Sequence, residues 1–486
     1  MRKVCLVGCL VAAAQVCVVA EPVVVKPAVT ETTNGKSSAE KKADEKPSVG
    51  KPTIKFYGGA QGVVVLVSPK YTYSKKVTDG AGGLGVDIGD VKKTDKDTSM
   101  PRAVGGEAFV GVKVNGTARS GIEYGAVIEL DAMKGDTGVD KMYVLVGRKN
   151  AGVLQVGNVK GPEAVFLCSG QQLIGGTLGV DGVVPSDVDA ATGVVGPLHV
   201  IGYTNKATKI VYYSPRVWGL QAGVAFTPDT KHIGHEKRDR STGTSKLGND
   251  EGLYVPAKDA ERPSGRTNLS FGLSHKYEWT PKIRTEFAAV YLCENTRKIT
   301  LKYNDVERSI NLRKARAYHL TATLFYGDLG IGVGYLNNGK SRLPKDYSEF
   351  NTAAAAPGGP INGAEHGNGG FIAEEGANAG SAWNIGMQYK RNDWTFAAVF
   401  HRTQRKVSYS QKTKGNMLTL TADYKVCEGL GLFAEFDYIW TKSCERACAL
   451  RNAFANEGVA NAADEKAVAI EKQKCPVYAV GIKVNF

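Results

Sequence analysis

The chain has 486 residues, with 62 Lys and Arg against 48 Asp and Glu, a formal net charge of +14 and 42% hydrophobic residues. Its mean hydropathy is −0.22, and no stretch after residue 20 approaches the roughly 18 uncharged apolar residues of a membrane-spanning helix. The 21 Tyr, 15 Phe and 5 Trp are too many for a disordered polymer. These values exclude a helical membrane bundle and global disorder, and they favour a folded, β-rich chain.

The first twenty residues have the pattern of a secretory signal peptide. Two basic residues precede an apolar run that ends in small residues at Ala20, so we expect cleavage of residues 1–20 and export of the protein. Residues 21–52 contain four Pro and no aromatic residue, and we expect them to form a disordered periplasmic linker. The folded domain is then expected over 53–486.

From Ile54 onward the apolar residues alternate with polar or small ones, which is typical of strands that bury or expose one face. Ile122, Tyr124, Ala126, Ile128 and Leu130, for example, alternate with Glu123, Gly125, Val127, Glu129 and Asp131. About sixteen such runs occur, and most have the 9 to 11 residues that a tilted strand needs to cross a bilayer. We expect them to start near residues 54, 106, 120, 141, 152, 207, 218, 267, 283, 316, 329, 382, 394, 416, 430 and 477.

The connections between these runs alternate strictly between short and long. The short ones are 115–119, 149–151, 215–217, 277–282, 327–328, 391–393 and 425–429; the long ones are 68–104, 132–140, 161–206, 228–266, 294–315, 337–381, 402–415 and 441–476. All tight turns therefore fall at one end of the strands and all long loops at the other, an asymmetry that transmembrane barrels have and soluble β-sandwiches do not need. The prediction is an all-β fold, an antiparallel transmembrane β-barrel of about sixteen strands.

All five tryptophans are expected at strand ends, where an aromatic girdle would meet the lipid headgroups. Three lie beside short turns and two beside long loops: Trp218, Trp279 and Trp394, and then Trp383 and Trp440. Tryptophans of a soluble core would be scattered along the strands instead.

Several segments resemble Gram-negative general porins of the alphaproteobacterial type. Gly147–Asn158 resembles the hairpin that precedes the constriction loop of that family, Thr208–Leu220 resembles its strand, serine-proline turn and next strand, and the chain ends in an aromatic residue, Phe486. The resemblance implies a water-filled barrel in the outer membrane that forms a homotrimer and admits ions and small hydrophilic solutes by diffusion. It also implies that the third long loop, 161–206, folds into the lumen, and that Phe486 is the signal read by the barrel assembly machinery.

Within 161–205 the charged residues are all acidic: Glu163, Asp181, Asp187 and Asp189. If this loop enters the barrel, its carboxylates would face basic side chains of the wall, for which the alternation names Lys55, Lys113, Lys209, Arg284 and Lys483. Opposed charges across a narrow passage sort ions by sign, and we expect weak anion selectivity. The alternative is that these acidic residues are solvated outside the barrel. The overall positive charge is expected to contact outer-membrane lipid and lipopolysaccharide, or to be solvated.

Catalytic and cofactor chemistry find little support. Gly80–Gly85 formally matches a dinucleotide-binding glycine pattern but lies in a polar loop with no following helix pattern. The seven His have no metal-ligand spacing. Six cysteines remain after removal of residues 1–20, and their disulfide pairing is open: Cys168, Cys293, Cys427, Cys444, Cys448 and Cys475. We expect no enzyme activity, no metal, no cofactor and no nucleic-acid partner.

Two functions are compatible with such a barrel. One is a porin, which needs an open polar lumen. The other is a surface adhesin or antigen whose long loops 228–266 and 337–381 bind a host partner, and whose lumen could be plugged. The inward-facing Glu, Asp, Lys, Gly and Thr residues favour the porin.

Overall fold

The structure is a computed structural model, and it describes the backbone of most of the chain after residue 50. The described residues are 51–67, 70–75, 91–96, 102–131, 138–177, 200, 203–204, 206–229, 265–296, 299–303, 306–343, 345, 378–406, 412–442 and 468–486. Within them, every helix is too short or too polar to traverse a bilayer. Residues 1–50, with the predicted signal peptide and nearly all of the predicted linker, lie outside the described residues.

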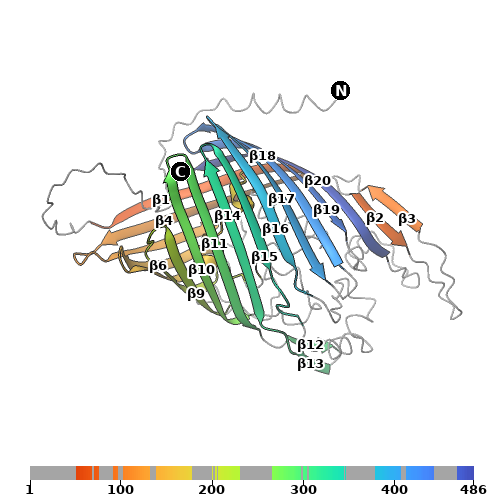
Figure 1. Cartoon of the computed structure of the whole chain (residues 1–486), viewed down its shortest axis with the longest axis horizontal. Helices are drawn as coiled ribbons and strands as arrows, with labels where there is room; N and C mark the ends of the chain where they lie inside the picture. Colours follow the sequence, from red (N-terminus) through yellow and green to blue (C-terminus); the bar gives the residue numbers. More distant parts are fainter. Residues whose placement is uncertain are drawn as a thin grey trace.

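Antiparallel strands make up almost the whole structure (Figure 1). The main sheet has 18 strands, of which β2 and β3 form an appended hairpin, so sixteen build the wall. The sixteen are β1 (Thr53–Val67), β4 (Arg102–Thr117), β5 (Glu123–Asp131), β6 (Gly138–Arg148), β7 (Gly152–Asn158), β8 (Thr208–Tyr213), β9 (Leu220–Asp229), β10 (Gly265–Thr280), β11 (Ile283–Thr296), β14 (Ala315–Tyr326), β15 (Leu329–Asn337), β16 (Ser381–Arg391), β17 (Trp394–Lys406), β18 (Lys412–Cys427), β19 (Leu430–Lys442) and β20 (Val468–Asn485). The predicted barrel of sixteen strands is confirmed.

The sheet closes on itself because the last strand pairs with the first. Strand β20 is antiparallel to β1, with Gly59 opposite Asn485 and Val67 opposite Val477. Beyond the end of β20, Phe486 exchanges two backbone hydrogen bonds with Gly58, at 3.0 and 3.1 Å. The terminal aromatic residue is therefore part of the closing seam, and no edge strand remains on the wall.

Two of the predicted long loops contain strands that the sequence pattern did not predict. β2 (Lys70–Lys75) and β3 (Val91–Lys96) form a hairpin that pairs with the extension of β20. β12 (Ile299–Tyr303) and β13 (Val306–Ile310) form a separate two-stranded sheet. β2 and β3 are rich in Lys, Thr and Tyr, and their alternation lacks the apolar face by which the wall strands were recognised. β12 and β13 have only 5 residues each, which is shorter than the runs counted as membrane-crossing strands.

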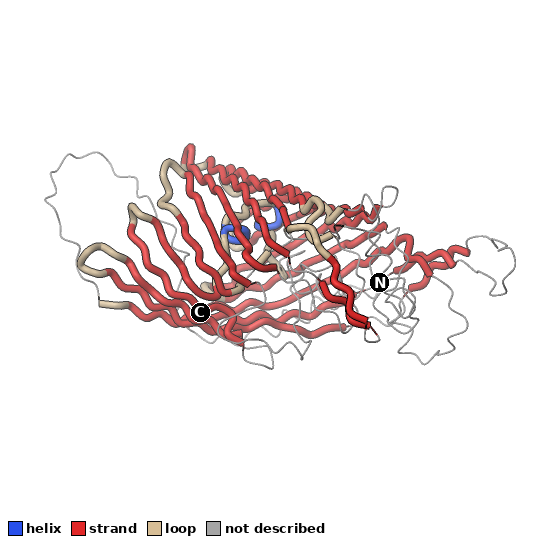
Figure 2. Tube along the Cα trace, turned by 90° about the horizontal axis from the view of Figure 1, so that it is seen from below, coloured by secondary structure: helices blue, strands red, loops and turns tan. Residues whose placement is uncertain are grey.

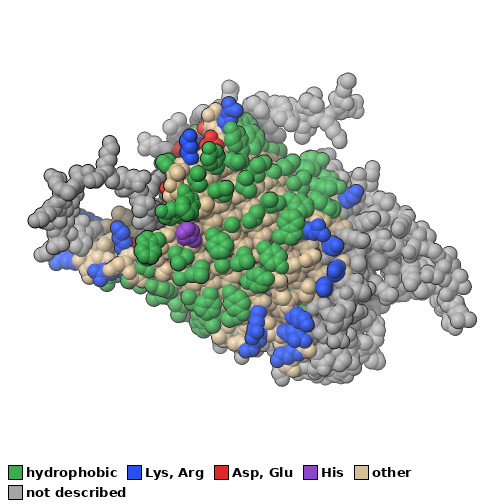
Figure 3. All heavy atoms as spheres, viewed as in Figure 1, with side chains coloured by type: hydrophobic (Ala, Val, Ile, Leu, Met, Phe, Trp, Pro, Cys, Tyr) green, Lys and Arg blue, Asp and Glu red, His purple; other side chains and the backbone are tan. Residues whose placement is uncertain are grey.

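The outer surface of the wall is apolar, as the alternation predicted. On β5, for example, Ile128 and Leu130 are exposed while the neighbouring Val127 and Glu129 are buried inside. Figure 3 shows the resulting continuous hydrophobic face over the strands. The five tryptophans are at strand ends or in a turn, as predicted, and four of them are exposed: Trp218, Trp279, Trp383 and Trp394.

Part of the inner surface is also apolar, which the alternation did not indicate. Inward-facing Val63 and Val65 of β1 pack with Ile439 of β19 and Val477 of β20 in one buried cluster. These positions lie toward the loop ends of their strands. The lumen is therefore not lined by polar side chains along its whole length.

Candidate functional site: the inner strap and the wall opposite it

The connection that follows β7 runs along the inside of the barrel. Its described part, residues 161–177, is named the inner strap here; it contains α2 (Pro162–Val165) and the short 3-10 helix η2 (Gly170–Leu173). Figure 2 shows both helices enclosed by the strands. The strap touches β9, β10 and β11 first and then β15, β16 and β17. The predicted folding of the third long loop into the lumen is confirmed for this part.

The strap lies close to the wall because the wall carries glycines where it passes. A Cβ atom built at Gly332 of β15 would lie 2.7 Å from the nitrogen of Gly170, and one at Gly386 of β16 would lie 2.8 Å from the Cα of Gly170. On β9 and β10, Gly223 and Gly272 leave the same space for Pro162 and Phe166. We name the wall positions Gly223, Gly272, Gly332, Gly334 and Gly386 the glycine track.

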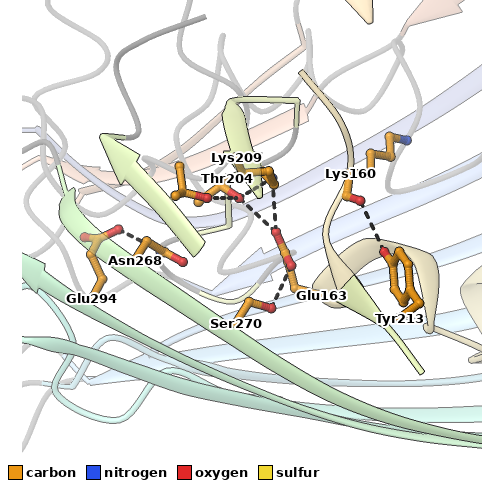
Figure 4. A network of polar contacts seen from close by, with 9 residues as sticks. Lys160, Glu163, Thr204, Lys209, Tyr213, Asn268, Ser270 and Glu294 are labelled. Atoms are coloured by element: carbon orange, nitrogen blue, oxygen red, sulfur yellow. Dashed lines mark hydrogen bonds and ion pairs between the residues drawn. The ribbon is translucent and has the colours of Figure 1, made fainter. Parts of the chain in front are cut away.

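A buried polar network fixes the beginning of the strap (Figure 4). The Glu163 carboxylate on α2 lies 3.5 Å from Lys209 Nζ of β8, and both side chains are fully inaccessible. Thr204 Oγ1 and Ser270 Oγ donate hydrogen bonds to Glu163 at 2.9 and 2.7 Å, and Lys209 Nζ also donates to Thr204 Oγ1. A buried ion pair needs such additional hydrogen bonds to offset its desolvation.

This network corrects two sequence-based expectations. Glu163 was expected among acidic residues of the constriction and Lys209 among basic residues of the pore wall. Both side chains instead pair with each other behind the strap, with no exposure to water. Alternation correctly placed Lys209 on the inner face, but it could not show that another segment covers that position.

The middle of the strap is fixed by apolar and neutral contacts. Phe166 packs in a buried cluster with Tyr213 and Ala288 of the wall. The Cys168 N–H donates to Thr321 Oγ1 at 3.1 Å, and Thr323 Oγ1 donates to the Cys168 carbonyl at 2.6 Å. Because it is buried there, the pKa of the Cys168 thiol is raised, and the side chain is a free thiol.

Carboxylates of β18 and β19 fix the far end of the described strap. The Gly176 N–H donates to Asp423 Oδ1 at 2.9 Å. Thr177 donates to Glu435 from both its N–H and its hydroxyl, the latter at 2.7 Å. Slightly earlier in the strap, Gln388 of β16 donates a hydrogen bond to the Leu173 carbonyl at 2.6 Å. Since Glu163 is the only charged residue of the strap, the strap itself presents no charge to the lumen.

The wall opposite the strap carries charged side chains that water can reach. Lys55 of β1 and Lys113 of β4 are direct cross-strand neighbours on the inner face. Lys55 is exposed and Lys113 is half-buried. Lys141 of β6 is 29% exposed and lies 2.5 Å from Glu129 Oε1, whose other oxygen accepts a hydrogen bond from Tyr57 at 3.1 Å. The inner face of this part of the wall therefore carries ionic side chains that water can reach.

Of the remaining predicted pore residues, the structure describes the two basic ones and not the three acidic ones. Arg284 faces inward near the turn end of β11, 3.4 Å from Glu286 and 4.1 Å from the centre of the Phe325 ring. Lys483 lies 3.7 Å from Asp423 and 4.8 Å above the Phe433 ring. Asp181, Asp187 and Asp189 lie outside the described residues, so their position in the lumen stays a prediction.

Sequence reasoning missed the glycine track, although the sequence contains a signal for it. In β15 every second residue, Gly330, Gly332 and Gly334, is glycine, while the alternate positions are apolar and face outward. Glycine weakens an isolated strand and often marks the close approach of another backbone. Cys168, Cys293 and Cys427 are free thiols, and Cys475 is buried in the wall. Cys444 and Cys448 lie outside the described residues.

A family model of Gram-negative porins matches residues 9–443 of the chain. The chain belongs to the Gram-negative porin family. Such proteins reside in the outer membrane, which assigns this porin to the same location. Across the part of this porin that the structure describes, no group of three or more His, Cys, Asp or Glu side chains could hold a metal ion.

The relatives that match this porin in sequence are distant. The porin is 27% identical over 184 residues to the uncharacterized protein RP068 of Rickettsia prowazekii and 25% identical over 186 residues to the uncharacterized protein RT0064 of Rickettsia typhi. Each match covers 32% of this porin and 42% of the relative, so the matched region spans less than half of either chain.

Two solved structures that align with this porin are 11% and 12% identical to it in sequence. OmpT of Vibrio cholerae with loop L8 deleted aligns with a TM-score of 0.48 over 90% of this chain and 99% of that chain. An anion-selective porin from Comamonas acidovorans aligns with a TM-score of 0.46 over 90% of this chain and 100% of that chain.

Proposed function

We propose that the protein is a passive diffusion channel of the outer membrane for ions and small hydrophilic solutes. The observation that carries this proposal is the arrangement of the lumen: the strap lies flat against one wall, and the opposite wall presents Lys55, Lys113 and Lys141 to water. A channel for hydrated solutes needs charged groups that orient water without closing the passage. No catalytic or cofactor chemistry is required for this function.

We further propose weak anion selectivity, set by the water-accessible bases of the inner wall. Lys55 and Lys113 are adjacent and of the same charge, so the local potential there is positive, whereas Arg284 and Lys483 are each close to a carboxylate. In this proposal Asp181, Asp187 and Asp189 would lie in the constriction and oppose the bases. Position decides selectivity more than the overall charge, since Glu163 and Lys209 cancel within a buried pair.

Planar-bilayer recording of the refolded protein tests both proposals. Stepwise conductance increments, with a reversal potential under a salt gradient that indicates anion preference, are expected. Silence from protein that is demonstrably folded would overturn the channel, and cation preference would overturn the selectivity. Liposome swelling with neutral sugars of increasing size would then measure the solute limit.

We propose a homotrimer whose contact surface is the outer face of β1 and β4–β7. The exposed outward residues there are largely aliphatic, including Ile54, Val110, Ile128, Val144 and Val156. From β10 to β20 the outer face instead carries tryptophan, tyrosine and phenylalanine side chains at strand ends, which suit a lipid-headgroup boundary. Lipid therefore suits one side of the barrel better than the other.

A pair of matched variants tests that interface. Val144→Trp on β6 is expected to prevent trimer formation, because the ring would stand between subunits, while Ile331→Trp on β15 should be tolerated at a lipid-facing position. Both residues are exposed aliphatic side chains in the isolated subunit. Native mass spectrometry in detergent measures the oligomeric state; an unchanged trimer in Val144→Trp would reject the interface.

We also propose that folding of the barrel into the outer membrane depends on recognition of Phe486 by the barrel assembly machinery.

A further inference from the structure

A bulge in the pairing of β5 with β6 turns one additional charged side chain into the lumen. Glu129 of β5 is opposite Lys141 of β6, and the next residue of β5 is opposite Val139. Asp140 is therefore the extra residue of the bulge. Val139 and Met142, which flank the two charged residues, are exposed on the outer face. Asp140 and Lys141 are thus adjacent in the chain and both on the inner face, which regular alternation forbids.

These two side chains form ion pairs with different segments of the chain. Lys141 Nζ lies 2.5 Å from Glu129 Oε1. Asp140 Oδ2 accepts a hydrogen bond from Lys206 Nζ. Lys206 follows two residues after Thr204, which belongs to the buried network behind the strap (Figure 4). We name Glu129, Lys141, Asp140 and Lys206 the mixed-charge row.

Water reaches three of the four side chains of this row. The exposed fractions are 29% for Lys141, 23% for Lys206 and 19% for Asp140, against 7% for Glu129. The row differs in this respect from the ion pair behind the strap, which is fully inaccessible. A solute in the lumen can therefore contact an acid and a base of the row at the same time.

Tyr57 of β1 positions the least exposed member of the row. Its ring lies across the inner wall over Gly111 of β4, where a Cβ atom would be only 2.3 Å from the ring carbon Cζ. The Tyr57 hydroxyl reaches the next strand and donates to Glu129 Oε2 at 3.1 Å. The Glu129 carboxylate is therefore held by Tyr57 on one side and by Lys141 on the other, which pre-organises it before any ligand arrives.

Charges of both signs continue on the neighbouring positions of the same face. Asp131 lies two residues beyond Glu129 along β5, toward the loops. Lys55 and Lys113 lie on the side of the turns, where Lys113 is opposite the residue two positions before Glu129. The row itself contains two acids and two bases and has no net charge. It is therefore suited to a ligand that also carries both signs.

A singly charged ion would separate one of the pairs without replacing the lost partner. An anion that binds Lys141, for example, competes with Glu129 for the same ammonium group. A zwitterion supplies both signs, so its carboxylate can bind a base of one pair while its ammonium binds the acid of the other. Each charged group then keeps an opposite charge as its neighbour, and the new hydrogen bonds are charge-assisted.

We propose that the mixed-charge row binds the ammonium and carboxylate groups of zwitterionic α-amino acids. Lys141 holds the carboxylate, and Asp140, next to it on the bulge, holds the ammonium. The inference rests on the proposed function, because a solute must enter the lumen to reach the row, and it names one class of solute for that passage. Binding is weak enough for the solute to leave again, as passage through a channel requires.

Titration of the folded, detergent-solubilised protein with three ligands of the same shape tests the proposal. At neutral pH alanine carries both charges, isobutyrate carries only the carboxylate and isopropylammonium carries only the ammonium. Saturation-transfer NMR detects weak binding without any transport, and it is expected to show the tightest binding for alanine. Equal affinity of the wild type for all three ligands would overturn the proposal.

Two variants assign the binding to the row. Asp140→Asn and Lys141→Gln should each bind alanine about tenfold more weakly, because each removes one charge-assisted hydrogen bond. The matched control is Glu428→Gln, which removes the carboxylate of an exposed ion pair at a turn and should bind alanine as the wild type does. Unchanged affinity in both row variants, or equal weakening in the control, would also overturn the proposal.

Liposome swelling separates this inference from the proposed function. Liposomes that contain the protein and do not swell with a small neutral sugar would reject the diffusion channel, while alanine binding in detergent would still support the row. Liposomes that swell with the sugar, from a protein that binds alanine no better than isobutyrate, would support the channel and reject the row.

Discussion

Gly170 of the inner strap and Gly386 of β16 meet backbone to backbone: a Cβ atom at Gly170 would lie 2.3 Å from the Gly386 nitrogen, and one at Gly386 would lie 2.8 Å from the Gly170 carbonyl oxygen. Distances this short leave no room for any side chain on either partner. The strap is therefore seated directly on the wall at this point. The width of the passage depends on glycine as much as on charge.

Adding one methyl group to the glycine track should move the strap toward the lumen. In Gly332→Ala, the three nearest atoms to the new Cβ all belong to the backbone of Ser169 and Gly170, at 2.7 to 2.9 Å. Overpacking of this kind costs about 1–3 kcal/mol, and the single-channel conductance should fall. Gly431→Ala is the control, because its Cβ would be 3.5 Å from the closest atom. Equal conductance in the two variants would contradict the role of the track.

Removing the charge of Glu163 should release the beginning of the strap. Glu163→Gln leaves the Lys209 ammonium buried without a carboxylate, and breaking a buried pair in this way costs about 3–5 kcal/mol. We expect larger and noisier single-channel currents, and a lower unfolding temperature. Adding Lys209→Met should recover much of the loss. Lys425→Gln, which removes the exposed pair with Glu428, should leave the single-channel current and the unfolding temperature unchanged. An effect of Lys425→Gln as large as that of Glu163→Gln would contradict a specific role for the buried pair.

The thiol of Cys168 should report whether the strap is docked. It is buried and its pKa is raised by that burial, so less thiolate is present at a given pH, and the reaction with a maleimide should be slow and should accelerate only at higher pH than for an ordinary thiol. Cys427 is exposed and should react readily. In Glu163→Gln, labelling of Cys168 should become faster, as measured by mass spectrometry of proteolytic peptides. Rapid labelling of Cys168 in the wild type would mean that the strap is not docked.

Neutralising the two adjacent lysines on the wall opposite the strap should weaken the anion preference. The double variant Lys55→Gln, Lys113→Gln removes two positive charges from the lumen, so the reversal potential under a salt gradient should shift toward that of a cation-selective channel. Lys406→Gln is the control for a base on the outer face. A reversal potential that responds equally to both changes would place the selectivity elsewhere.

Alternation and loop length were sufficient to predict the barrel, most of its strand starts and the position of its tryptophans at strand ends. The exception among the starts is β20, which begins at Val468 and not near residue 477. The reason is that most wall strands repeat one local rule, outward apolar and mostly inward polar or small. All of the wall strands except β7 and β8, which have 7 and 6 residues, repeat it over 9 or more residues. Strands that do not follow this rule were not predicted. β2 and β3, with their Lys and Thr residues, pair through backbone hydrogen bonds that need no apolar face.

The sequence by itself determined which face of each strand a residue occupies, as Lys113 and Lys209 illustrate: both were placed inside, and both are inside. Only the tertiary structure decided that Lys113 meets water while Lys209 is sealed behind the strap against Glu163. The face of the sheet on which a side chain lies is a local property that alternates with a period of two residues. Whether that side chain is covered depends on the position of a segment 46 residues away in the chain. That contact is selected by glycines and hydrogen bonds on several strands at once, a pattern that no single stretch of sequence contains.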